Sequence, residues 1–254
     1  MENKIKKYLL DLEKERGIKI LLACETGSRA WGFPSPDSDY DVRVIYKHDT
    51  HWYLSLTEEK DSIELFLDNN EVDISGWDIR KSLRLLWKSN PPLLERIQSP
   101  YIYSMDEEFV AEVKEIANET YSRIGTIHHY LSMATKIYAE ISPMKDYKLK
   151  KFFYALRCSV ACIWILEKEE LPPIEFDKML NGLTFPKTIT DRIEILIKLK
   201  ATISETYVHQ GEKEIFQFME TCMERATKEK SKLAGGKAQM ADLNKFFQKT
   251  ILAK

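Results

Sequence analysis

The 254-residue sequence has no long apolar run, no surplus of charge of one sign and no cysteine cluster. No stretch approaches the ~18 consecutive apolar residues that suggest a membrane-spanning helix, so we expect no membrane partner. Lysine and arginine number 38 against 40 aspartates and glutamates, and the net charge is −2. This balance excludes a protein that is basic overall and leaves room only for a local nucleic-acid-binding patch.

The four cysteines also lack the CxxC spacing of zinc and redox motifs. Cys158 and Cys162 are four residues apart in an apolar helical stretch, where thiols in the core are the expected role. The N-terminal residues alternate charges with apolar side chains and lack the uninterrupted apolar segment of a signal peptide. Together these features predict a cytoplasmic protein with reduced thiols.

Short apolar runs separated by turn-forming residues characterise the first hundred residues. Asp78 is suited to cap a helix that runs to about Ser89, and Asn90-Pro91-Pro92 is expected to end it. Apolar spacing predicts a helix over 3–16, and alternation or apolar runs predict strands over 18–24, 40–46, 63–67 and 72–74.

The pattern becomes almost wholly helical after Tyr103. Apolar residues recur every three or four positions in the stretches 106–141, 146–168, 189–208 and 211–231, and a last short helix is expected over about 239–251. The sequence therefore predicts an α+β fold with a mixed-sheet domain over 1–104 and an α-helical bundle domain over 105–254.

Three aspartates in the first domain have the spacing of a metal site. Asp39 and Asp41 lead into a strand, where residues two apart face the same side at roughly 7 Å between their Cα atoms. Asp73 lies between two apolar residues of a later strand, and pairing of the two strands would bring its carboxylate ~4.8 Å away. Three carboxylates on one face repel each other unless a cation binds, and Mg²⁺ prefers such oxygen ligands.

Gly27 and Ser28 follow an apolar strand and precede the first aspartate pair by ten residues. A glycine lets the backbone approach a ligand closely, and the N–H groups at the start of a helix attract phosphate. The Ser28 hydroxyl and the Arg29 guanidinium would add donors to a triphosphate. An Asp-x-Asp pair alone is commonly a solvated turn, and only its combination with Gly-Ser and the later aspartate favours catalysis.

These residues resemble the DNA polymerase β nucleotidyltransferase superfamily. GSRAWGFPSPDSDYDVR is similar to its Gly-Ser plus Asp-x-Asp signature. The stretches VDISGWDIRKSL, NPPLLERIQSP and KKFFYALRCSVACIWIL resemble one branch, the predicted nucleotidyltransferases associated with RNA repair systems, and the likeness spans most of residues 18–180.

The resemblance implies that Asp39 and Asp41 hold two metal ions, Mg²⁺ or Mn²⁺, that Asp73 holds one of them, and that Gly27 and Ser28 bind the nucleotide phosphates. It also implies transfer of a nucleoside monophosphate from a nucleoside triphosphate such as ATP to an RNA 3′ end, with release of pyrophosphate. Two rivals remain: an antitoxin-like enzyme that modifies a protein acceptor, and a nucleotide- or RNA-binding module without catalysis.

Three residues of the helical domain, Lys150, Tyr154 and Arg157, fall at i, i+4 and i+7 and therefore share one helix side. One interpretation is that they face the cleft and bind the triphosphate or the base. The other is a solvated helix face with a packed tyrosine, and the spacing alone does not separate the two.

Overall fold

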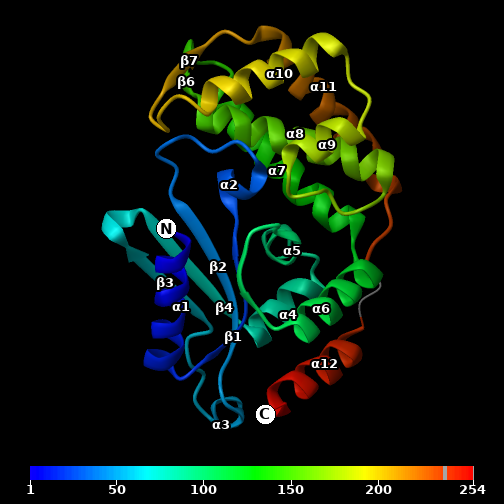
Figure 1. Ribbon diagram of the computed structural model, residues 1–254. Helices are drawn as coiled ribbons and strands as arrows, with labels where there is room; N and C mark the ends of the chain where they lie inside the picture. Colours follow the sequence, from blue (N-terminus) through cyan, green and yellow to red (C-terminus); the bar gives the residue numbers. More distant parts are fainter. Residues whose placement is uncertain (237–238, 254) are drawn as a thin grey trace. The chain divides into compact units, whose positions relative to one another are not determined.

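The computed structural model describes residues 1–236 and 239–253, which form two compact units (Figure 1). The sheet unit contains Met1–Ala30, Asp39–Tyr121 and the C-terminal segment from Gly236. The helical unit contains Trp31–Ser38 and Ser122–Gly235. The short segment 31–38 therefore belongs to the helical unit although both its chain neighbours belong to the sheet unit.

The sheet unit is built on a five-stranded mixed sheet; the sequence predicts a mixed sheet and four of its strands, but not β5. The strand order is β3-β4-β2-β1-β5; β2 and β4 are parallel, and the other neighbouring pairs are antiparallel. The strands are β1 (Lys19–Glu25), β2 (Tyr40–Lys47), β3 (Ser62–Leu67), β4 (Val72–Asp78) and β5 (Ile102–Met105).

One face of this sheet is covered by helix α1 (Glu2–Arg16), which lies across it in Figure 1. The buried helix residues Ile5, Leu9 and Leu12 recur at three- and four-residue spacing and pack against the strands. The strand residues of this core alternate along their strands, as a face covered by a helix requires: Val42, Val44, Tyr46, Val72 and Ile74.

Further helices complete the sheet unit. Asp78 caps α4 (Ile79–Trp87), its Oδ1 accepting from the Arg80 N–H at 2.7 Å. Asn90 then caps α5 (Pro91–Gln98), because proline fits the first helical positions, where no N–H is needed. The helix after Asp78 ends before Asn90 as expected, and Asn90-Pro91-Pro92 also begins the next helix. The remaining helices are α2 (Gly27–Trp31), α3 (Thr50–Tyr53), η1 (Asp68–Asn70), α6 (Glu107–Thr120) and α12 (Met240–Leu252).

The helical unit has its own apolar core around α8 (Leu149–Lys168), whose residues are buried on nearly every side. Its other elements are α7 (Arg123–Ile141), β6 (Asp146–Lys148), α9 (Phe176–Gly182), α10 (Lys187–Lys200), β7 (Val208–Gln210), α11 (Lys213–Glu229) and η2 (Lys230–Lys232). None of the helices in the described part of the chain is both long and apolar enough to cross a membrane.

The units of the structure differ from the 1–104 and 105–254 domains that the sequence suggests. The helical stretch over 106–141 divides at Ser122, which caps α7, so that α6 belongs to the sheet unit. The last helix also returns to the sheet unit. Buried Lys47 donates to the carbonyls of Thr250 and Ala253 at 2.8 and 2.9 Å, which satisfies the C-terminal end of α12.

Candidate active site

Two of the three predicted aspartates are direct neighbours across the parallel strands. Asp41 of β2 is paired in register with Asp73 of β4. Their side chains lie on the face opposite α1, because Val42 and Ile74, the next residues along each strand, belong to the core under α1. Each side chain retains about a fifth of its exposure, 20% for Asp41 and 21% for Asp73. The predicted convergence of these two carboxylates is therefore present.

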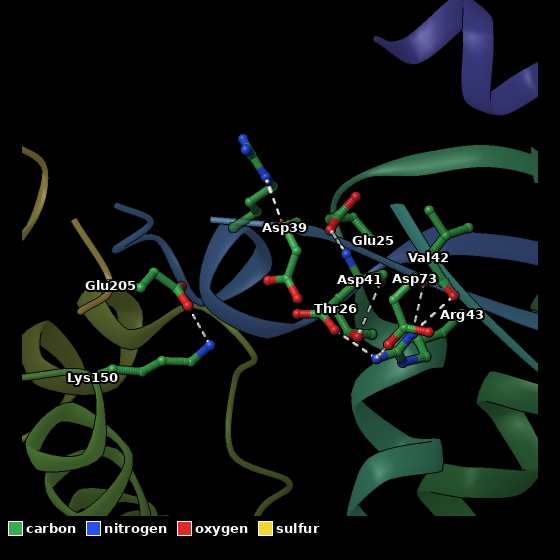
Figure 2. Close-up of polar contacts among 10 residues, drawn as sticks. Glu25, Thr26, Asp39, Asp41, Val42, Arg43, Asp73, Lys150 and Glu205 are labelled. Carbon is green, nitrogen blue, oxygen red and sulfur yellow. Dashed lines mark hydrogen bonds and ion pairs between the residues drawn. The ribbon is translucent and has the colours of Figure 1, made fainter. Parts of the chain in front are cut away.

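Arg43 connects the two carboxylates. Its Nη2 donates to Asp41 Oδ1 at 2.6 Å and to Asp73 Oδ2 at 2.9 Å (Figure 2). Its Nη1 donates to the carbonyls of Val42 and Asp73 at 3.1 and 3.0 Å. One guanidinium thus reduces the repulsion between the two carboxylates, and it does so from the same strand face, two residues beyond Asp41.

Gly27 lies directly against Asp41. A β-carbon on Gly27 would collide with the carboxylate, with Asp41 Cγ only 2.8 Å away, and the Gly27 φ of +63° is itself unfavourable for other residues. Ser28 follows in the first turn of α2 and is buried. The predicted phosphate-binding Gly27-Ser28 pair is therefore adjacent to the carboxylate pair.

The backbone of Asp41 is held at both of its polar groups by the end of β1. Its N–H donates to Glu25 Oε1 at 2.6 Å, and its carbonyl accepts from the Thr26 N–H at 2.9 Å (Figure 2). The second oxygen of Glu25 accepts from the Tyr103 hydroxyl. These contacts fix the position from which the Asp41 side chain extends.

Glu25 is 2% exposed, and burial raises its pKa to about 7. The hydrogen bonds from Tyr103 and from the Asp41 N–H oppose this rise by stabilising the carboxylate, while the charge of Asp41 adds to it. Tyr103 in turn has its pKa raised by burial and by its bond to Glu25, so it stays a hydroxyl donor.

Asp39 and Arg29 occupy the approach to β2. Asp39 immediately precedes the strand, and in Figure 2 its carboxylate points to the same side as that of Asp41. Arg29 donates from Nε to the Asp39 carbonyl at 3.1 Å, and its guanidinium lies 3.8 Å from the ring centroid of Tyr40. Arg29 thereby secures the backbone between the two motifs, and its predicted contact with phosphate stays a prediction.

The donor set fits a divalent cation at Asp41 and Asp73, because two paired carboxylate oxygens already converge on one positive group. Asp39 does not complete a cluster: within residues 1–236 and 239–253, no three His, Cys, Asp or Glu side chains lie close enough together to hold a metal. The structure thus brings two of the three predicted ligands together, and the three-aspartate metal site stays a prediction.

The three predicted nucleotide-binding residues of α8 make contacts inside the helical unit. Lys150 forms an ion pair with Glu205 at 2.5 Å (Figure 2), and Tyr154 packs edge-on against Trp31. Arg157 is 2% exposed, donates to the Ile174 carbonyl at 3.1 Å and lies against the Trp31 ring. Arg157 lies neither on an open cleft nor on a solvated helix face, because Trp31 covers its side of α8. A nucleotide contact for the three stays a prediction.

Two residues that contact Asp41, Glu25 and Arg43, are not among the residues predicted from the sequence. Both had a signal in the sequence. Glu25 is the charged residue that ends an apolar strand two positions before Gly27, and Arg43 has the same strand parity as Asp41. The alternation of side chains along a strand does not reveal that the Arg43 guanidinium turns back toward Asp41.

A model of the family described as "RlaP: RNA repair pathway DNA polymerase beta family" matches residues 1–249. "Uncharacterized protein YcgL" of Bacillus subtilis (strain 168) is 36% identical over 252 residues, which cover 99% of this chain and 96% of that protein. "tRNA (34-2'-O)-methyltransferase regulator WDR6" of Drosophila melanogaster is 24% identical over 136 residues, 52% of this chain and 13% of that protein.

Among solved structures, a nucleotidyltransferase-like protein from Exiguobacterium sibiricum 255-15 is similar over 90% of this chain and 75% of that chain, at 10% sequence identity and a TM-score of 0.33.

Proposed function

The chain belongs to the RNA repair pathway DNA polymerase beta family and is nucleotidyltransferase-like, and from that premise we propose that it transfers a nucleoside monophosphate from a nucleoside triphosphate to an acceptor hydroxyl. The proposed acceptor is an RNA 3′ end, and ATP is the first donor to test. The family description supports an acceptor in RNA.

One observation carries the proposal: Asp41 and Asp73 are paired across β2 and β4, directly beside Gly27. A triphosphate placed on the backbone of Gly27-Ser28 would have its α-phosphorus next to this carboxylate pair. Phosphoryl transfer needs mainly positioning and neutralisation of charge. The backbone at Gly27 and Ser28 would supply the positioning, and cations held by the carboxylates would supply the neutralisation.

In the proposed reaction, the acceptor oxygen forms a bond to the α-phosphorus as the bond from that phosphorus to the β-bridging oxygen breaks. Pyrophosphate leaves, and the proton of the hydroxyl passes to a base. Asp73 is the carboxylate proposed for this role, because Asp41 lies on the side of Gly27 and so of the triphosphate. The N–H groups at Gly27 and Ser28 orient the phosphates.

Asp41, Asp73 and Asp39 together would hold two Mg²⁺ or Mn²⁺ ions. When bound, such cations would supply the positive charge that offsets the triphosphate and favours ionisation of the acceptor hydroxyl. Arg43 donates to both Asp41 and Asp73, and this attraction of a positive group supports the proposal that the pair would hold a cation.

The test is incubation of the protein with each α-labelled nucleoside triphosphate and Mg²⁺, with total RNA in one reaction and total protein in another. We expect label on RNA 3′ ends from wild type, and a loss of several orders of magnitude in Asp41→Asn and Asp73→Asn. Asp61→Asn is the matched control, because Asp61 pairs with Lys81 on the surface of the same unit.

Each outcome separates one alternative. If label appears in protein alone, the proposed nucleotidyl transfer would stand and the acceptor would be a protein side chain instead of RNA. No label in either reaction, with the nucleotide still bound, would favour a binding module. Turnover of Asp41→Asn and Asp73→Asn at the wild-type rate would remove both carboxylates from the mechanism.

A further inference from the structure

β3 is an edge strand of the sheet (Figure 1), and an exposed phenylalanine lies near its end. Phe66 keeps 63% of its surface accessible. Its neighbours Leu65 and Leu67 point the other way and pack against the core under α1, together with Ile63. The apolar residues that this strand needs for folding are therefore on the opposite face, and Phe66 is not one of them.

Strand register places Phe66 in one row with the two carboxylates. Phe66 is paired with Asp73 across β3 and β4, and Asp73 is paired with Asp41 across β4 and β2. Directly paired residues of neighbouring strands have their side chains on the same face. The aromatic ring is therefore about one strand spacing, ~4.8 Å, beyond Asp73 and on the side away from Asp41 and Gly27.

A single exposed apolar side chain is common on protein surfaces and needs no explanation by itself. The position of Phe66 is what distinguishes it. Edge strands usually carry polar or charged residues on their exposed face. Glu64, two positions before Phe66 on the same face, is such a residue. Here the residue beside a carboxylate pair is a flat ring, and an aromatic ring stacks well on a nucleobase.

We propose that Phe66 is a stacking site for the terminal nucleobase of the RNA acceptor. This inference rests on the proposed function, in which the acceptor hydroxyl lies at Asp73 and the triphosphate lies at Gly27. The base of the nucleotide that carries that hydroxyl is a few ångströms from it, so it falls over the next strand outward, where the ring of Phe66 is exposed.

The chemistry of the site sets its selectivity. Every base has a π face, so stacking on Phe66 tolerates any terminal base. The exposed carboxylate of Glu64 on the same face repels phosphates. The site therefore accepts one terminal nucleotide and does not extend along β3 toward Glu64.

The experiment is direct binding of a short single-stranded oligoribonucleotide, labelled at its 5′ end, by fluorescence anisotropy without nucleoside triphosphate. We expect Phe66→Ala to weaken binding about tenfold, the lower part of the range for loss of one base–aromatic stack. Phe66→Trp should restore binding, because it retains a stacking surface. Leu56→Ala is the control: Leu56 is fully exposed in the same unit but outside the sheet.

Binding should be equal for the four terminal bases within a few-fold. Wild-type affinity in Phe66→Ala would overturn the stacking site, as would absence of binding by the wild-type chain. If wild type labels a protein acceptor and does not bind the oligoribonucleotide, the stacking site fails and nucleotidyl transfer stands. If Phe66→Ala loses binding but wild type transfers no label, the stacking site stands and the proposed reaction fails.

Discussion

The backbone of Gly27 and the carboxylate of Asp41 are in such close contact that no side chain fits between them. Gly27 is the first residue of α2, which follows β1, and Asp41 belongs to β2. The two are held together by hydrogen bonds from the Thr26 N–H and the Thr26 hydroxyl to the Asp41 carbonyl. Gly27 and the carboxylate pair are thus one structural unit, and this contact fixes the distance between them.

Gly27→Ala should abolish nucleotidyl transfer by displacing Asp41. Gly17→Ala is a matched control, since Gly17 has a similar φ of +60° and nothing within 4 Å of an added β-carbon. Left-handed strain should cost each variant about 1 kcal/mol of unfolding free energy, and Gly27→Ala should lose more than Gly17→Ala because Asp41 must also move. Urea denaturation measures both losses. Only Gly27→Ala should lose activity. Equal activity in the two variants would show that contact with Asp41 is unimportant.

Arg43→Met should destabilise the protein in EDTA, because Asp41 and Asp73 then face each other without a positive partner. The side chains are partly solvated, so we expect a loss of about 1 kcal/mol. Mg²⁺ should raise the melting temperature of Arg43→Met more than that of wild type, since the cation replaces the lost charge. Thermal unfolding in EDTA and in MgCl₂ measures both effects.

Arg43→Lys serves as the control for charge, because it keeps one positive group without the guanidinium geometry. Its melting temperature in EDTA should lie between those of wild type and Arg43→Met. Identical Mg²⁺ responses in all three proteins would argue against a cation site at Asp41 and Asp73.

The contribution of Asp39 to metal binding is separable from that of Asp73. Manganese affinity, measured by electron paramagnetic resonance of free Mn²⁺, should fall in both Asp39→Asn and Asp73→Asn if both carboxylates are ligands. Because Asp73 is one of the paired carboxylates and Asp39 is not, we expect the larger loss in Asp73→Asn. Unchanged affinity in Asp39→Asn would reduce the metal site to two aspartates.

Glu205 should control the order of the segment 31–38. Its Oε1 accepts from the Ser38 hydroxyl at 2.7 Å, its Oε2 pairs with Lys150, and its N–H donates to Asp37 Oδ1 at 2.9 Å. Ser38 directly precedes Asp39 in the chain. Glu205→Gln should speed amide hydrogen exchange in residues 31–38 and raise the nucleotide KM. Exchange at the wild-type rate would mean that Phe33, buried in the helical core, anchors the segment alone.

Burial of Lys200 predicts how the unfolding free energy of the protein changes with pH. It is 2% exposed and donates to Ser35 Oγ at 3.0 Å, and burial lowers its pKa below the usual 10.5, with Glu205 partly opposing the shift. Between the lowered pKa and 10.5, the unfolded chain binds more protons than the folded chain. The unfolding free energy contributed by Lys200 therefore rises with pH through that window.

Lys200→Met removes this titration and keeps the length of the side chain. The difference in unfolding free energy, wild type minus Lys200→Met, should increase as pH rises toward 10.5 and then level off. Urea denaturation at a series of alkaline pH values gives this difference. A difference that is constant with pH would mean that Lys200 is not deprotonated more easily in the folded protein.

The sequence by itself determined α1, four of the five strands of the sheet and the faces they bury, but not β5 or the division between α6 and α7. Apolar residues at helical spacing set α1, and the flanking core residues Val42 and Ile74 turn Asp41 and Asp73 toward the other face. Steric limits at a positive φ explain Gly27. These effects act between residues near in the chain, so the pattern of one segment reveals them. The α+β fold and membership of the family follow from such patterns.

Only the tertiary structure decided which segments meet. The pairing of β2 with β4 puts Asp73 beside Asp41, the pairing of β3 with β4 adds Phe66 to the row, and Lys47 brings α12 back to the sheet unit. Each of these pairings and contacts joins residues far apart in sequence. Its free energy is a sum over many packing and hydrogen-bond partners, and no single segment carries the information that selects among competing pairings.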